Sequence, residues 1–168
     1  MLGLKMATDP RWVKIVEKNI EEILTDHAYC EQKAATNCIT IIQMFPEYEE
    51  VVDALMPIVT EEWGHFRMVV DQLKKRGMAL GRQRRDEYVN QLQSNIIQGG
   101  SRDHQLVERL LIAALIEARS CERFRLLSLD IADDELKEFY RKLMISEAGH
   151  FRLFLDLAIS ISPKTQVM

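Results

Sequence analysis

The sequence predicts an all-α protein built around four long helices. Glycine (7) and proline (4) are scarce among the 168 residues. Long stretches place apolar residues three and four positions apart, which is the period of a helix with one buried face. The alternation of β-branched residues that would indicate strands is rare. We therefore expect nearly the whole chain to be helical and to form a bundle.

The chain is predicted to open with a shorter helical segment. In Asp9-Pro10, the aspartate can cap a helix and the proline can occupy its first position. This first segment is expected to run to about Leu24, with a break near Thr25-Asp26. Four longer helices are predicted after it, over about residues 26–45, 47–76, 102–131 and 133–160.

A basic connector separates the second and third of these long helices. It reads KKRGMALGRQRRDEYVN, and its later part is predicted to form a short helix. Before it, Gly77 suits the position just after a helix end, and after it Ser101 suits a helix N-cap. Two helix hairpins joined by a long connection are the plan of a ferritin-like four-helix bundle.

Two six-residue words in the chain agree at five of their six positions. EWGHFR begins at Glu62 and EAGHFR begins at Glu147, 85 residues later, in a sequence with only four histidines. Residues three apart share one face of a helix, so Glu62 with His65, and Glu147 with His150, can each hold a metal ion. A lone Glu-x-x-His is common by chance and usually lies on a surface. Two of them at matching positions favour a metal site and an internal pseudo-twofold axis.

In carboxylate-bridged di-iron bundles, the other two helices supply one glutamate each. Glu31 and Glu117 are 86 residues apart, close to the offset of the two words. Each lies in the apolar stripe of its helix, where an unpaired carboxylate would be costly. Glu122 is the alternative on the third long helix, but five residues from Glu117 is about 140° around the helix. The sequence therefore favours Glu117.

Other residues near these positions receive weaker interpretations. His27 is expected to be a core histidine or a partner of a ligand rather than a seventh ligand, and Tyr140 is expected to pack in the core. Gly64 and Gly149 suit either close helix packing or free space beside the metals. The arginines after the two words are expected to form ion pairs within the hairpins; they are Arg67 and Arg152.

The composition limits where the protein works and what it contacts. No apolar run approaches the roughly 18 residues of a membrane span, and no signal peptide opens the chain. The three cysteines include no Cys-x-x-Cys pair, which is typical of a reducing cytoplasm. A net charge of −4 argues against a protein that coats DNA but permits a local basic patch. We expect a cytoplasmic protein with neither a membrane nor DNA as partner.

The ligand types favour iron or manganese over structural zinc. Di-iron sites of four carboxylates and two imidazoles reduce molecular oxygen. From the residues alone, a monooxygenase, a desaturase, a peroxidase and an iron oxidase all stay open.

At TDPRW, DHAYCEQKAA, EEWGHF, LIEARSCERF and FYRKLMISEAGHF, the chain resembles the MiaE-type tRNA hydroxylases. The resemblance extends from about Asp9 to Ala158. It implies a ferritin-like, non-haem di-iron monooxygenase that hydroxylates the isopentenyl group of 2-methylthio-N6-isopentenyladenosine in tRNA. It also implies two iron ions, molecular oxygen as co-substrate and an external reductant such as a ferredoxin-like protein. Taken position by position, the implied ligands are Glu31, Glu62, His65, Glu117, Glu147 and His150, with Glu62 and Glu147 as the expected bridges.

The resemblance also implies a surface for tRNA. The predicted RNA-binding residues are the cations of the connector: Lys74, Lys75, Arg76, Arg82, Arg84 and Arg85. A basic, solvated helix end explains the same cluster equally well. Residues 1–168 are expected to form a single ferritin-like di-iron domain. Two alternatives stay open: a ferritin- or rubrerythrin-like oxidase or peroxidase without an RNA substrate, and a helical adaptor with a vestigial metal site.

Overall fold

The computed structural model describes residues 2–84, 87–94 and 99–162, and these form six helices and no strands. In chain order the helices are α1 (Trp12–Lys18), α2 (Ile20–Met44), α3 (Glu49–Lys75), α4 (Glu87–Ser94), α5 (Arg102–Asp130) and α6 (Asp134–Ile161). The predicted all-α class is confirmed, as is the short helix in the connector. In the part of the chain described, no helix is both long enough and apolar enough to cross a membrane.

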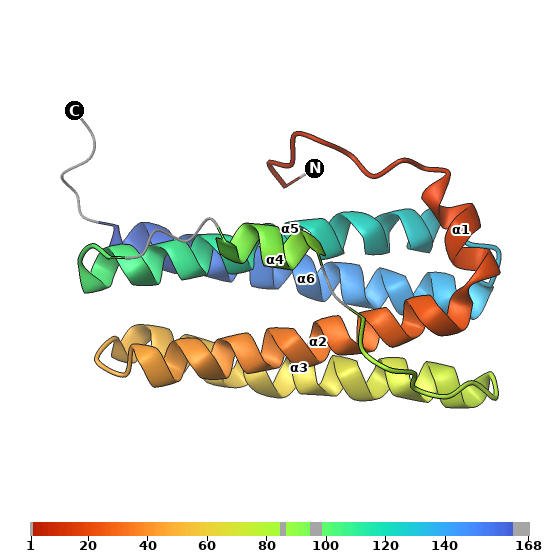
Figure 1. The fold of residues 1–168 in the computed structure, drawn as a ribbon, viewed down its shortest axis with the longest axis horizontal. Coiled ribbons are helices and arrows are strands. Elements are labelled where there is room, and N and C mark those ends of the chain that lie inside the picture. The colour runs from red at the N-terminus through yellow and green to blue at the C-terminus, as the bar shows by residue number, and fades with distance from the viewer. Residues whose placement is uncertain (1, 85–86, 95–98, 163–168) are drawn as a thin grey trace.

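The four long helices form two hairpins that lie against each other (Figure 1). Helix α2 packs along α3, and α5 packs along α6. Contacts between α2 and α5, and between α3 and α6, join the two hairpins. The connection from α3 to α5 carries α4, which packs on α5. This is the two-hairpin bundle predicted from the sequence.

The break between the first two helices lies at Asn19, not near Thr25-Asp26 as predicted. Asn19 has φ −138° and ψ 41°, and its side-chain amide donates a hydrogen bond to the carbonyl of Ile15 at 2.8 Å. Asparagine competes in this way with the helical hydrogen bonds of the backbone. Thr25 instead lies buried within α2, where its hydroxyl accepts a hydrogen bond from the Gly81 N–H at 3.2 Å.

Other predicted helix ends agree with the structure more closely. Ser101 caps α5 by accepting a hydrogen bond from an N–H of the first turn, and Gly77 after α3 has φ +67°. The start predicted at Pro10 is two residues early, because α1 begins at Trp12. The Asp9 carboxylate still binds the backbone just before that helix, where it accepts a hydrogen bond from the Arg11 N–H at 2.9 Å.

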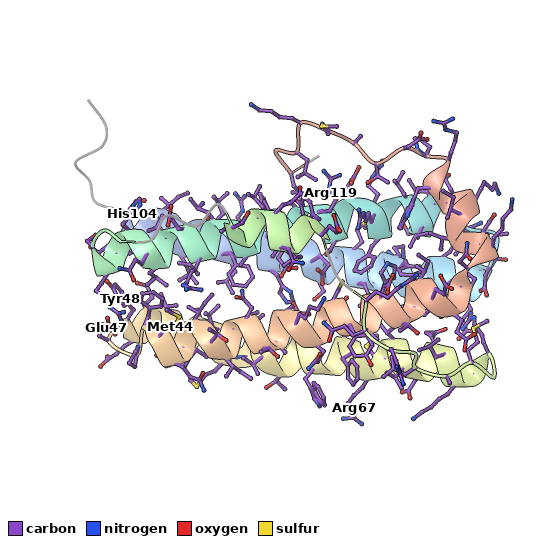
Figure 2. All side chains as sticks on the ribbon, in the orientation of Figure 1. Met44, Glu47, Tyr48, Arg67, His104 and Arg119 are labelled. Carbon is purple, nitrogen blue, oxygen red and sulfur yellow. The ribbon has the colours of Figure 1, made fainter. Side chains whose placement is uncertain are left out.

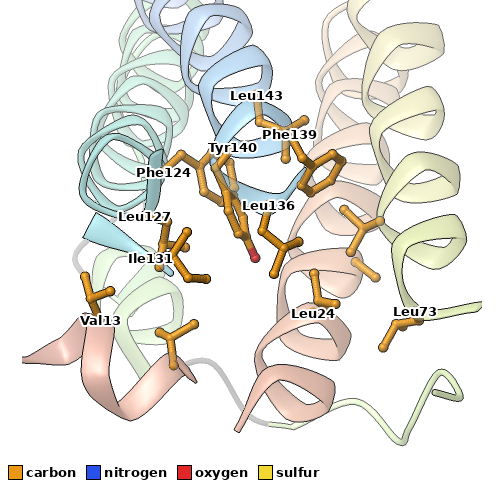
Figure 3. Packing of buried hydrophobic residues seen from close by; sticks show 13 residues of the cluster. Val13, Leu24, Leu73, Phe124, Leu127, Ile131, Leu136, Phe139, Tyr140 and Leu143 are labelled. Atoms are coloured by element: carbon orange, nitrogen blue, oxygen red, sulfur yellow. The ribbon is translucent and has the colours of Figure 1, made fainter. Parts of the chain in front are cut away.

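Two clusters of buried apolar side chains fill opposite ends of the bundle. One lies near α1 and includes Leu24 and Tyr140 (Figure 3). The other lies near the α2–α3 turn and includes Phe45 and Phe154. Between the clusters, every long helix carries buried ionisable side chains. The apolar core is therefore interrupted at the middle of the bundle.

The α2–α3 turn is tied to the start of α5 (Figure 2). The Arg102 guanidinium donates to the Glu47 carboxylate at 2.7 Å and to the carbonyl of Met44. The Tyr48 hydroxyl donates to the Asp103 carboxylate. These contacts hold the two hairpins together at the end of the bundle that lies away from α1.

Candidate metal centre

Six buried side chains meet where the apolar core is interrupted. Helices α2 and α5 supply one glutamate each, while α3 and α6 each supply a glutamate and a histidine. They are the six residues expected from the sequence: Glu31, Glu117, Glu62, His65, Glu147 and His150. None is more than 7% exposed, so the bundle shields the whole cluster from bulk water.

The six residues form two groups, each with three carboxylates and one imidazole. Within a group, one ligand atom from every residue lies within 4.8 Å of the others. Residues of α2 and α3 complete one group, and residues of α5 and α6 complete the other. Glu62 and Glu147 belong to both groups. The arrangement suits two neighbouring cations that share two carboxylates.

Both histidines turn Nδ1 toward the carboxylates. His65 Nδ1 lies 3.1 Å from Glu62 Oε2 and 3.5 Å from Glu31 Oε2. The same nitrogen is 3.9 Å from Glu147 Oε1. His150 Nδ1 lies 2.7 Å from Glu62 Oε1. Nδ1 is therefore the nitrogen that each histidine presents to a metal.

Several of these buried atoms lack a hydrogen-bond partner in the described part of the chain. They include Oε1 of Glu62, Oε1 of Glu147 and Nδ1 of His150. Glu62 Oε1 and His150 Nδ1 lie close together without the geometry of a hydrogen bond. Buried polar atoms without partners are rare and require an explanation. Ligand atoms gathered around a common ion have this arrangement, and the donor set fits iron or manganese.

Without cations, the cluster holds extra protons. Burial raises the pKa of Glu31 to about 8 and the pKa of Glu117 to about 7. Burial, with Glu117 nearby, raises the pKa of Glu147 well above its usual value. Burial alone would lower the pKa of His65, but the neighbouring carboxylates raise it to about 10. Burial alone would raise the pKa of Glu62, but the two imidazoles lower it to about 2. Metal binding would release the extra protons, because ligands must be deprotonated.

Glu61, which was not predicted from the sequence, faces both histidines from the outer side. Its Oε2 lies 3.3 Å from His150 Nε2, and its Oε1 lies 3.9 Å from His65 Nε2. The Ser146 hydroxyl donates to Oε1 of Glu61 at 2.5 Å. His150 Nε2 has no hydrogen-bond partner in the described part of the chain, so Glu61 faces this nitrogen without a hydrogen bond. A carboxylate at the far nitrogen favours the tautomer that offers Nδ1 to a metal.

Internal symmetry explains why one carboxylate reaches two imidazoles. Glu61 and Ser146 stand immediately before the two repeated words, 85 residues apart. The pseudo-twofold relation brings these two positions together, so a single acid there faces both histidines. In the sequence, the sign of this role was the glutamate that directly precedes EWGHFR.

Glu117 reaches the cluster and Glu122 does not. The Glu122 carboxylate accepts a hydrogen bond from Arg119 at 2.6 Å. It also accepts hydrogen bonds from the backbone N–H of Thr8 at 2.5 Å and from its hydroxyl at 2.8 Å. Glu122 therefore links the segment before α1 to α5. It can do so because it lies on a different face of α5 from Glu117.

His27 lies outside both ligand groups. Its Nδ1 is 2.9 Å from the Tyr140 hydroxyl, and its ring packs edge-on against Phe124. Burial, helped by the nearby Arg123 cation, lowers the pKa of His27 to about 3. The core positions expected for His27 and Tyr140 are confirmed.

The two glycines and two arginines of the repeated words differ from expectation. A Cβ atom added at Gly64 or Gly149 would meet nothing within 4 Å, so neither close packing nor space beside the metals requires glycine there.

The ion pairs predicted for Arg67 and Arg152 are wrong, since neither has one within the described ranges and both are exposed. Each lies two residues after a ligand histidine, about 200° around its helix. Figure 2 shows Arg67 on the outer side of α3.

A cavity of about 930 Å³ opens between α2 and α5 beside the cluster. Its lining includes the carboxylates of Glu31, Glu117 and Glu147. All other charged residues of its described lining are cations, and they are Lys33, Arg84, Arg109, Arg119 and Arg123. A chain with a net charge of −4 thus gathers positive charge around a route to the candidate metal centre.

The residues predicted to bind RNA are divided between two places. Lys74, Lys75 and Arg76 lie at the end of α3. Lys75 pairs with Glu135 at 2.9 Å, and Arg76 pairs with Asp133 at 2.8 Å. These two cations are therefore partly neutralised by acids around the start of α6.

The remaining predicted cations lie in the connector. Arg84 lines the cavity and pairs with Asp26 at 2.9 Å and Glu22 at 3.0 Å. Arg82 is exposed. Arg85 falls outside the residues that the structure describes.

The sequence matches known proteins over most of its length. The family described as tRNA-(MS[2]IO[6]A)-hydroxylase (MiaE) matches residues 2–168. A Pseudomonas putida protein named tRNA 2-(methylsulfanyl)-N(6)-isopentenyladenosine(37) hydroxylase is 33% identical, with 92% of this chain and 74% of that protein covered. A Salmonella typhimurium protein of the same name is 25% identical, with 86% and 70% covered.

The fold is similar to that of a solved structure described as Protein 43 with aldehyde deformylating oxygenase activity from Synechococcus. The two agree with a TM-score of 0.90 and 34% sequence identity, over 96% of this chain and 79% of that one. The ferritin-like bundle predicted from the sequence is thereby confirmed. Because the family match spans nearly the whole chain and a relative is 33% identical, the protein belongs to the MiaE family of tRNA hydroxylases.

Proposed function

We propose that this protein is an oxygen-dependent di-iron monooxygenase that hydroxylates the isopentenyl group of 2-methylthio-N6-isopentenyladenosine in tRNA. The observation that carries the proposal is the pair of ligand groups sharing Glu62 and Glu147, in a chain of the MiaE family. Two iron ions bound there would supply the activation of molecular oxygen, with one oxygen atom entering a substrate C–H bond and the other leaving as water. The two electrons required come from outside the chain, and a ferredoxin-like protein is the proposed donor.

The proposed ligands are the six buried residues: Glu31, Glu62, His65, Glu117, Glu147 and His150. Glu62 and Glu147 are the proposed bridges, because they alone belong to both groups. Glu61 faces the far nitrogens of both imidazoles and would favour the tautomers that direct Nδ1 at the cluster. Apolar clusters pack on both sides of these side chains along the bundle.

The large cavity is the proposed site for the modified adenosine. Its volume of about 930 Å³ lies within the range of small-molecule pockets, about 300–1,000 Å³. Ile112 and Ile116 offer apolar surface next to the carboxylate of Glu117, which suits an isopentenyl group. A buried site requires the target base to leave its stack, and a single-stranded loop permits this at low cost.

We further propose that residues 1–168 act as one domain, because both hairpins contribute to one cluster. A tRNA substrate also makes the cytoplasm the proposed location.

The Synechococcus structure motivates a second candidate, an oxygenase acting on an aldehyde. The cations around the cavity favour a polyanionic substrate over a neutral aldehyde. A ferritin- or rubrerythrin-like oxidase without an RNA substrate is the third candidate, and it leaves these cations without a role.

A single turnover tests the proposal. The iron-loaded protein is reduced and exposed to oxygen together with tRNA that carries the methylthio-isopentenyl adenosine, and the digested nucleosides are analysed by mass spectrometry. We expect one added oxygen atom on that nucleoside, and none with Glu62→Ala. A competent di-iron spectrum without oxygen transfer to the nucleoside would contradict the proposal. The same reaction with a long-chain aldehyde or with peroxide then tests the other two candidates.

A further inference from the structure

A second cavity, of about 330 Å³, adjoins the large one near α1. Three aromatic residues contribute to its lining: Trp12 of α1, Tyr29 of α2 and Tyr88 of α4. All three are partly exposed, so their rings are accessible to a ligand. The role proposed for the metal centre does not use this cavity.

The two cavities share a boundary. Five residues line both, and they are Cys30, Lys33, Arg84, Tyr88 and Arg123. Three of these five are cations. A ligand that extends from one cavity into the other must therefore pass positive charge.

The charge at this boundary is only partly compensated. Arg84 is paired with Asp26 and Glu22. Lys33 and Arg123 form no ion pair within the described ranges, although Glu87 also lines the smaller cavity. The Arg123 guanidinium lies 5.6 Å from the ring centroid of Trp12, which places an unpaired cation beside an aromatic face.

Single-stranded RNA is recognised by this combination of groups. Bases stack on aromatic side chains or on guanidinium planes, while lysine and arginine bind the phosphates between them. When a target nucleoside occupies a deep pocket, the phosphate joining it to its neighbour must lie at the pocket entrance. Here the cations lie where the two cavities meet, together with Tyr88, while Trp12 and Tyr29 line only the smaller cavity.

We propose that the smaller cavity holds the nucleotide adjacent to the target adenosine. Its base packs against Trp12 and Tyr88, and the phosphate that links the two nucleotides binds Lys33 and Arg123. This assignment rests on the proposed function, since it takes the large cavity as the adenosine site. It also moves the main RNA contact away from Lys75 and Arg76, which line neither cavity and are paired with acids.

Binding of three ligands tests this assignment: the free modified nucleoside, a dinucleotide containing it, and an anticodon stem-loop. Dissociation constants are measured with metal-loaded protein and no reductant, so binding does not depend on turnover. Lys33→Ala and Arg123→Ala are each expected to weaken stem-loop binding roughly tenfold and to reduce its salt slope by about 0.7. Binding of the nucleoside is expected to weaken less, and Arg123→Lys is expected to restore much of the stem-loop affinity.

Arg67→Ala is the matched control, because Arg67 is an exposed arginine on the outer side of α3 (Figure 2).

The fluorescence of Trp12 gives a second measurement. The chain has two tryptophans, Trp12 and Trp63, so a Trp63→Phe variant reports on Trp12 alone. The dinucleotide is expected to quench its fluorescence, and the nucleoside is not.

Stem-loop affinity unchanged in both Lys33→Ala and Arg123→Ala, or equal losses for nucleoside and stem-loop, would overturn the assignment. Equal quenching by nucleoside and dinucleotide would also count against it. Failure of the proposed function is a different result: the unaltered protein would bind the stem-loop and leave its adenosine unhydroxylated.

Discussion

Glu117 and Glu122 lie on the same helix, and their different surroundings lead to opposite predictions. We expect Glu117→Ala to lose bound iron, because one ligand group then has two carboxylates instead of three. Glu122→Ala is expected to keep two irons but to lower the free energy of unfolding by about 1–3 kcal/mol, as its contacts with Thr8 and Arg119 are lost. Iron per chain and urea unfolding measure these two effects. Full iron content in Glu117→Ala would contradict the ligand assignment.

Glu61 is predicted to control metal affinity without touching the metals. Glu61→Ala removes the carboxylate that faces Nε2 of both His65 and His150, and the affinity for iron is expected to fall about 10–100-fold. Competition with a chelator measures this affinity. Glu138→Ala is the control, because Glu138 is an exposed glutamate on α6 that pairs with Arg141. Equal affinities in the two variants would show that the contacts of Glu61 do not matter.

The titration of the ligands predicts how pH affects the metal-free protein. The pKa of Glu31 is raised from 4.5 to about 8, and the pKa of Glu117 is raised to about 7. A carboxyl that holds its proton more tightly when folded contributes stability at low pH and loses it as pH rises toward the folded pKa. The pKa values of His65 and His150, raised from 6.5 to about 10 and about 9, have the same consequence above their usual pKa. The Tm of the metal-free protein should therefore fall between about pH 6 and about pH 8.

The stabilisation by bound metal is predicted to have the opposite pH dependence. Cations replace the bound protons, so affinity increases with pH, and the Tm difference between manganese-loaded and metal-free protein should widen over the same interval. Manganese avoids oxidation during the scan. A metal-free Tm that rises with pH would contradict the assigned proton positions.

At the scale of the helices, the glycines of the two repeated words give a test of local structure. Gly149 is exposed, and a Cβ atom there meets nothing within 4 Å, so Gly149→Ala is expected to stabilise the protein by up to about 1 kcal/mol through helix propensity. Gly77 has φ +67°, and Gly77→Ala is expected to destabilise it by about 1–2 kcal/mol. Thermal unfolding of the two variants should shift Tm in opposite directions. A lower Tm for Gly149→Ala would show that the helix needs glycine at this point.

The helices themselves follow from patterns that are local in sequence. The apolar period, Ser101 as a cap and Gly77 after a helix end depend on neighbouring residues, and these predictions agree with the structure. The break at Asn19 was misplaced because nothing nearby distinguished it from Thr25-Asp26. Its position depends on a side-chain bond to the backbone of α1 and on the burial of Thr25 under the connector.

The meeting of the six buried cluster residues was predictable because the repeat encodes a symmetric arrangement. The role of Glu61 was not predictable, because only the first of the two words is preceded by an acid. Its role depends on the residues before the two words, Glu61 and Ser146, meeting across the pseudo-twofold axis. Arg67 forms no ion pair among the described residues because it lies about 200° around the helix from His65, on an exposed face. The cations at the cavity come from α2, α5 and the connector, and sequence alone does not bring these segments together.

At the scale of the molecule, the bundle separates two tasks. Apolar clusters at both ends supply the packing, and the middle carries a charged cluster that packing alone would not favour. The large cavity between α2 and α5 borders the cluster through Glu31, Glu117 and Glu147. We propose that the substrate approaches through this cavity, past Lys33 and Arg123.

We propose that two metal ions lie between the hairpins and share Glu62 and Glu147. Anomalous diffraction at the iron edge from crystals of the iron-loaded protein tests it most directly. We predict two peaks per chain, one among Glu31, Glu62, His65 and Glu147 and the other among Glu62, Glu117, Glu147 and His150. A single peak, or a peak held by Glu61 or Glu122, would contradict the claim.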